Sequence, residues 1–255
     1  MLKRLLGLFG AGATPKPPPV AAPRSQPGEH PAEAALLHQI ALRSKEDPLI
    51  GAKIGSKEVT QRLLAGMKTE RGVHVESLLC ALGSVSGYAC QAAVRAQAAA
   101  KGLAETAPFI CASAQEGDNY YFGDALNRPL AESQYSVWSL AGGGAQAAGC
   151  TELPDMHEMF KHVTDSIGKP TFGLPRTPDT NKPGDTPINY VRSLWPALRP
   201  LVVKFCPNPE HWPVLLGLSA QEAIIMGKGV IDPGLAFRIV MESAIPMSKV
   251  ELGKV

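Results

Sequence analysis

A stretch of small and apolar residues between Arg71 and Lys101 constrains the fold more than any other part of the sequence. Its spacing predicts one long helix that carries a ridge of small residues, made of Cys80, Gly83, Gly87, Cys90 and Ala98. A glycine inside a helix costs about 1 kcal/mol relative to alanine, and close backbone contact with a neighbouring element normally offsets that cost. We therefore predict that this helix is the central element of the fold. The ridge is expected to pack inside the protein rather than between subunits, although a homo-oligomer joined through it is the alternative.

Length and charge exclude some classes of protein. The chain has 255 residues, of which 45% are hydrophobic, so it can bury a sizeable core. The formal net charge is +2, but four basic residues precede the first acidic residue, Glu29, which leaves 21 of the 25 basic residues against 23 acidic ones. A folded part without a basic stripe is not typical of nucleic-acid-binding proteins. We therefore predict no nucleic-acid partner.

The sequence contains five cysteines, an odd number, with no Cys-x-x-Cys pair. A chain of this length does not need disulfide bonds to stabilise its core. We therefore expect reduced thiols and a cytoplasmic protein. Cys111 is the best placed for a nucleophilic role, because it lies just before a turn, but its neighbours Ile110 and Ala112 favour packing.

Residues 1–30 differ in composition from the rest of the chain. Four apolar side chains share one face of a short helix opposite Lys3 and Arg4, namely Leu2, Leu5, Leu6 and Phe9. From Ala11 to Gly28 the chain is rich in proline and alanine, without hydrophobic periodicity, which is typical of a disordered tether. We expect weak peripheral membrane contact or docking of a protein partner through this segment. No run of eighteen apolar residues occurs, so no membrane-spanning helix is predicted.

Residues 31–255 are predicted to form a single, mainly helical domain with one inserted β-hairpin. Aromatic and branched residues lie on both sides of a turn at Glu116-Gly117-Asp118, which predicts a hairpin between Pro108 and Asp124. Proline and capping residues mark the remaining helices. Helices are expected to begin near Pro31, Asp47-Pro48, Ser56, Leu130, Pro154, Thr186-Pro187, Asn208-Pro209 and Asp232-Pro233. The triple glycine Gly142–Gly144 is expected to weaken one of them, and Pro246 to end the last.

The segment from Lys169 to Thr186 is rich in proline and glycine, with Asn181 and Asp185 among them. Such a composition denies it regular hydrogen bonding, and loops of this length inside a compact domain are either functional or disordered. We predict a flexible loop here. The sequence does not distinguish a lid over a site from an unstructured excursion.

The pair His74 and Glu76 opens the central helix with the His-x-Glu spacing of zinc deaminases. Those enzymes also need a Pro-Cys-x-x-Cys motif on a following helix, which this chain lacks. A carboxylate in the first turn of a helix is also favoured by the helix dipole, so a structural role explains Glu76 equally well. We predict neither a metal site nor a cofactor.

Aromatic residues gather around the predicted hairpin, beside Asp124. Pockets for small molecules combine apolar walls with a few convergent polar groups. The candidate ligand-binding residues are therefore His74, Glu76 and Asp124, in a pocket between the start of the central helix and the hairpin. The leading functional hypothesis is a non-enzymatic binding or interaction protein that uses its N-terminal segment for docking. The alternative is a small-molecule-binding domain or enzyme that uses this pocket, because catalytic residues need not form a local motif.

Overall fold

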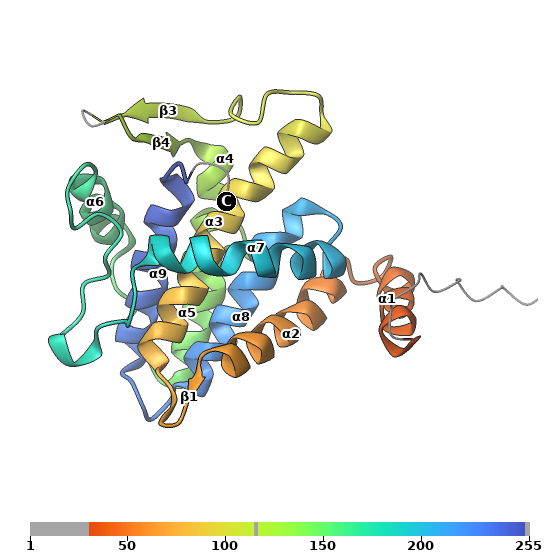
Figure 1. The fold of residues 1–255 in the computed structure, drawn as a ribbon, viewed down its shortest axis with the longest axis horizontal. Coiled ribbons are helices and arrows are strands. Elements are labelled where there is room, and N and C mark those ends of the chain that lie inside the picture. Colours follow the sequence, from red (N-terminus) through yellow and green to blue (C-terminus); the bar gives the residue numbers. More distant parts are fainter. Residues whose placement is uncertain (1–30, 115–116, 253–255) are drawn as a thin grey trace, which may run out of the picture.

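A computed structural model describes residues 31–114 and 117–252. The predicted N-terminal segment, residues 1–30, lies outside the described residues, as does Glu116 of the predicted turn. The protein is mainly helical, and Figure 1 shows its helices gathered around α3, with a hairpin at one end of the molecule and α1 set apart at the side. One continuous cluster of buried residues extends from Ile40 to Leu252.

The central helix, α3, covers Val75–Ala100 and is almost entirely buried. It packs along α9, which covers Pro233–Lys249. A Cβ atom added to Gly83 would collide with the carbonyl oxygen of Val240, and one added to Gly87 with that of Ala244. The expectation that the small-residue ridge packs inside the protein is therefore confirmed at these two glycines.

α3 is long and apolar enough to cross a membrane by length and mean hydropathy, although no such helix was predicted from the sequence. However, 89% of its most apolar 18-residue window is buried inside the protein. A buried polar side chain also joins α3 to the end of the chain's described part: Gln91 donates hydrogen bonds to the carbonyl oxygens of Ser248 and Val250, both at 3.1 Å. α3 is therefore a core helix of this fold.

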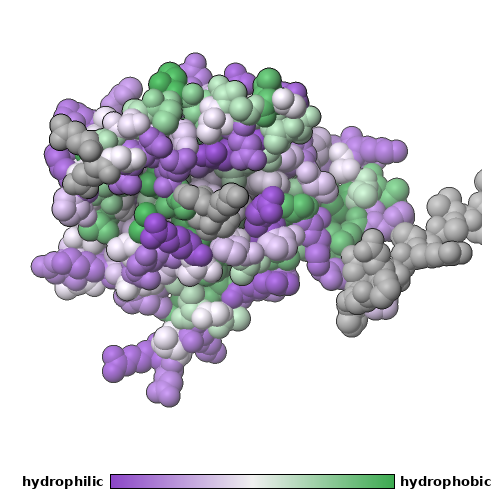
Figure 2. All heavy atoms as spheres, turned by 45° about the horizontal axis from the view of Figure 1, so that its top comes forward, coloured by the Kyte–Doolittle hydropathy of each residue, from purple (hydrophilic) through white to green (hydrophobic). Residues whose placement is uncertain are grey.

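Two helices precede α3: α1, Pro31–Arg43, and α2, Ile50–Gly66. The predicted helix start at Ser56 is wrong, because Ser56 lies inside α2 and its hydroxyl donates to the carbonyl oxygen of Lys53. Asp47 instead precedes the helix and accepts a hydrogen bond from the backbone of Leu49. α1 lies at the edge of the molecule, where Figure 2 shows hydrophobic side chains at the surface. Leu36 and Leu42 of this helix are exposed.

Two small antiparallel hairpins complete the described part of the chain. β3, Ile110–Ser113, pairs with β4, Asn119–Phe122, as predicted. Tyr120 forms a further bridge with Val250, so the C-terminal segment lies beside β4. The other hairpin, β1, Lys68–Thr69, with β2, Gly72–Val73, was not predicted, because two residues per strand leave no alternating pattern.

The segment between β4 and α5 departs from the prediction of a helix starting near Leu130. A short helix, α4, covers Asp124–Asn127, and a π-helix, η1, covers Arg128–Glu132. Pro129 has no N–H to donate to the preceding turn, and the chain widens instead, so that the N–H of Ser133 donates to the carbonyl oxygen of Arg128 at 2.9 Å.

α5 covers Val137–Ala148 and keeps its regular geometry through the triple glycine. The expected weakening is absent because the glycines allow close packing: a Cβ atom on Gly144 would lie 2.9 Å from the carbonyl oxygen of Gln221. Gln221 belongs to α8, which covers Trp212–Met226. The cost of glycine in α5 is therefore offset at its contact with α8.

α6 covers Met156–Ser166 and α7 covers Pro187–Phe205; the short 3-10 helices η2 and η3 cover Asp179–Asn181 and Pro209–His211. α7, η3 and α9 begin at their predicted caps, and α6 begins two residues after the predicted Pro154. η2 was not predicted. The side chains of Thr186 and Asp232 cap α7 and α9. The prediction that Pro246 ends the last helix is wrong, since α9 continues to Lys249. The lost hydrogen bond is tolerated in a helix whose last turns are almost completely buried.

Candidate functional site

The three candidate residues of the sequence analysis do not share a cavity. His74 and Glu76 lie together at the start of α3, with 3.3 Å between His74 Nε2 and Glu76 Oε2. Asp124 begins α4 and lies beside Val94, near the other end of α3. At 1.5 Å per residue, the part of α3 from Val75 to Val94 spans about 28 Å. The predicted pocket at the start of the central helix is therefore not built by these three side chains.

His74 and Glu76 instead contact the proline- and glycine-rich loop of residues 169–186, which we call the strap. Asn181 of the strap donates to Glu76 Oε1 at 2.8 Å. The backbone N–H of Gly184 donates to the hydroxyl of Ser77 at 2.8 Å, and that hydroxyl also contacts His74 Nδ1 at 2.8 Å. The first turn of α3 thus holds one end of the strap.

A buried carboxylate on α9 holds the middle of the strap. The side chain of Glu242 is fully buried and accepts hydrogen bonds from the backbone N–H of Arg176 at 2.7 Å and from its Nε at 3.0 Å. Arg176 also pairs with Glu158 on α6, and this hydrogen bond holds the pKa of Glu158 below its ordinary value. Arg238 Nη1 donates at 3.2 Å to Glu242 Oε1, the oxygen that also accepts from Arg176 Nε.

The strap lines a cleft of about 600 Å³ together with His162. Its central cation, Arg176, already has two carboxylate partners, which raise its pKa above the ordinary value of arginine. This arrangement fastens the strap to α6 and α9. Arg176 therefore stabilises the fold through its two carboxylate partners and is not free to bind a ligand in the strap cleft.

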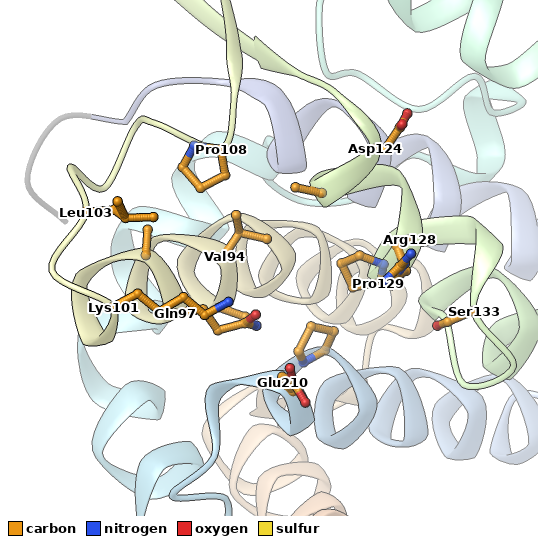
Figure 3. A pocket seen from close by; sticks show the side chains of 14 residues that line it. Val94, Gln97, Lys101, Leu103, Pro108, Asp124, Arg128, Pro129, Ser133 and Glu210 are labelled. Atoms are coloured by element: carbon orange, nitrogen blue, oxygen red, sulfur yellow. The ribbon is translucent and has the colours of Figure 1, made fainter.

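A second cleft, of about 510 Å³, lies at the C-terminal end of α3, and we call it the α3-end cleft. Its floor is apolar, with Ala93, Val94 and Ala98 from α3 and Pro213 from α8. Pro108 and Pro129 form further apolar walls, as Figure 3 shows. Small and rigid side chains thus enclose a space of the size that small-molecule sites use.

Polar side chains surround this apolar floor. They are Gln97, Lys101, Asp124, Arg128, Ser133 and Glu210. Within the described residues, none of the four longest, Gln97, Lys101, Arg128 and Glu210, forms a side-chain hydrogen bond or an ion pair. Figure 3 shows Gln97 and Lys101 reaching into the cleft, whereas the carboxylate of Asp124 points away from them. The α3-end cleft therefore has long polar side chains, both cations among them, that are free to contact a ligand, whereas the central cation of the strap cleft is already paired.

The π-helix η1 shapes one side of this cleft. Its wide turn places Arg128 and Ser133, five residues apart, on the same rim. π-helices are rare, and they occur frequently at functional sites. This feature gives the α3-end cleft a local backbone irregularity in addition to its unpaired polar groups.

Of the polar residues of this cleft, only Asp124 was predicted as a candidate from the sequence. Lys101, Arg128 and Glu210 come from three elements far apart in the sequence, and no local motif connects them. The proline at position 129 was the one signal that an irregular turn follows α4.

The cysteines lie elsewhere. Burial raises the pKa of Cys80 to about 11 and that of Cys206 to about 12, which disfavours their thiolate forms. Cys111 is exposed on β3. Among residues 31–114 and 117–252, no three His, Cys, Asp or Glu side chains come together in a group that would hold a metal ion.

Comparison of the chain with protein-family models, with curated proteins and with solved structures finds no match. Any functional conclusion therefore depends on the geometry of the α3-end cleft.

Proposed function

We propose that the protein is a binding protein that holds a small, largely apolar molecule in the α3-end cleft. The observation that carries this proposal is an apolar floor surrounded by polar side chains without partners in the described part of the protein. Its volume of about 510 Å³ lies within the range of about 300–1,000 Å³ common for ligand pockets. A ligand would supply hydrogen-bond and ion-pair partners to these polar side chains.

Binding explains this cleft better than catalysis. A nucleophile needs a base within hydrogen-bond distance, and that base usually needs a third group to orient it. The hydroxyl of Ser133 has no such partner among the described residues. The rim instead offers separate donors and acceptors, an arrangement that orients a bound molecule.

A neutral fluorescent dye, Nile red, tests the proposal. We expect saturable binding of one dye per chain, with the blue-shifted emission of an apolar environment. Ala125 lines the cleft from α4, so Ala125→Phe should fill the space and abolish binding. Ala99 is exposed on α3 and does not line the cleft, which makes Ala99→Phe a matched control. Equal dye binding by both variants, with circular dichroism spectra like that of the parent protein, would contradict the proposal.

An interaction role for residues 1–30 is a second proposal, together with a cytoplasmic location. All five cysteines are free thiols, which supports a reducing compartment. The adjoining helix α1, set at the edge of the molecule in Figure 1, exposes Leu36 and Leu42, which supports an interaction at this end. Flotation with anionic vesicles, and affinity capture with and without residues 1–30, test this role. Identical behaviour of the full-length and shortened proteins in both assays would exclude it.

A further inference from the structure

We infer that the ligand of the α3-end cleft carries a carboxylate on an apolar body. This inference rests on the proposed function and adds the chemical class of the ligand. Two cations, Lys101 and Arg128, line the cleft on either side of its apolar floor. Neither forms an ion pair with any described residue, so both charges are available to an anion.

The acidic residues of the cleft do not cancel these cations. Asp124 lines the cleft, but Figure 3 shows its carboxylate directed away from Gln97 and Lys101. Glu210 is the other acid in the described lining, and neither acid forms an ion pair with Lys101 or Arg128. A ligand carboxylate at either side of the floor would accept a charge-assisted hydrogen bond, from the ammonium group of Lys101 or from the guanidinium group of Arg128, and the amide of Gln97 supplies a further donor.

The carbonyl end of α3 opposes an anion, because the helix dipole places partial negative charge there. In this structure the last carbonyls are already occupied. The carbonyl oxygen of Ala98 accepts hydrogen bonds from the backbone N–H groups of Lys101 and Leu103, each at 3.0 Å. Two full positive charges on the rim therefore outweigh a partial charge that the chain has largely satisfied.

The floor selects for an apolar body. Val94, Pro108, Pro129 and Pro213 present aliphatic surface without hydrogen-bond donors. A straight alkyl chain of about eight carbons would lie along this surface with its charged end at the rim. Octanoate, 1-octanol and octylammonium share such a chain and differ only in the head group.

Isothermal titration calorimetry with these three compounds at low salt tests the inference on the full-length protein. We expect octanoate to bind about fivefold more tightly than 1-octanol, which is the effect of one partly exposed ion pair, and octylammonium to bind most weakly. Added salt should reduce the advantage of octanoate. The double variant Lys101→Gln, Arg128→Gln should bind octanoate no better than 1-octanol.

A control variant separates local from general charge effects. Lys68 is exposed on β1 and does not line the cleft, so Lys68→Gln should keep the preference for octanoate. Equal affinities for the three compounds, or tightest binding of octylammonium, would overturn the carboxylate inference and leave the proposed function standing. Failure of Nile red and of all three compounds to bind would overturn both.

Discussion

At the scale of single residues, Lys249 is the most unusual side chain in the described protein. It is 3% exposed, in the last turn of α9, and forms no ion pair with a described residue. Its Nζ lies 4.9 Å from the ring centroid of Phe122 and 5.6 Å from that of Phe160. Burial lowers the pKa of Lys249 to about 8, so the folded state holds this proton less tightly than the unfolded chain does.

The variant Lys249→Met is expected to be more stable than the parent protein at pH 7, by about 1–3 kcal/mol. The upper value follows from the pKa difference, and the two ring contacts, which favour the charged form, reduce it. Between pH 8 and the ordinary lysine pKa near 10.5, the unfolded chain binds more protons at this site. The free energy of unfolding of the parent therefore rises relative to that of the variant as pH increases through this window, and the stability difference between the two proteins shrinks.

Urea denaturation at pH 7 and pH 9.5 measures this gain. The buried thiols of Cys80 and Cys206 also titrate at high pH and act in the opposite direction, because the unfolded thiols ionise first. Both proteins contain these thiols, so the difference between the two curves isolates Lys249. A difference that stays constant with pH would show that the amine is not desolvated.

At the scale of elements, the contact between α3 and α9 depends on residues without side chains. Gly87→Ala is expected to lower the free energy of unfolding by at least about 2 kcal/mol, because the added methyl group would collide with the backbone of Ala244. Gly66, in the last turn of α2, provides the control, since a Cβ atom there would meet nothing within 4 Å. Gly66→Ala should stabilise the protein by up to about 1 kcal/mol. Equal effects in chemical denaturation would contradict the close packing of α3 on α9.

The ion pair between Arg176 and the buried Glu242 is expected to hold the strap in place on α9. Arg176→Ala should lower the free energy of unfolding by about 2–3 kcal/mol, because Glu242 is fully buried and would keep, among the described residues, only Arg238 as a charged partner. Amide hydrogen exchange should also accelerate across residues 169–186. Lys182→Ala removes an exposed pair with Asp179 in the same strap and should change stability by less than about 1 kcal/mol. Unchanged exchange in Arg176→Ala would show that other contacts hold the strap.

At the scale of the whole molecule, local patterns predicted the helical class, the central helix and the β3–β4 hairpin. The same patterns failed where packing overrides a local rule. Pro246 lies inside α9, and Ser56 inside α2, because buried contacts on both helices outweigh a lost hydrogen bond or a competing cap. Most of the α3-end cleft could not be predicted from the sequence, because folding alone brings Lys101, Arg128 and Glu210, from distant segments, to one cleft.

Removal of residues 1–30 is expected to leave the melting temperature unchanged to within about 2 °C, because most of this segment is rich in proline and alanine and lacks the apolar periodicity of a packed element. α1 keeps its own link to the body, with 2.6 Å between Lys204 Nζ and Glu33 Oε1. A thermal melt of the shortened protein measures this. A loss of several degrees would mean that the N-terminal segment packs on the body, and the notion of a separate tether would then fail.

The pairing of α3 with α9 also sets an order of events during synthesis. Ala100 ends α3, and α9 begins only at Pro233, so α3 leaves the ribosome on the order of ten seconds before the helix that covers its glycines. During that interval the nascent chain carries a helix apolar enough to resemble a membrane span. Until α9 is synthesised, newly made chains of this protein therefore expose an apolar surface that is prone to aggregation.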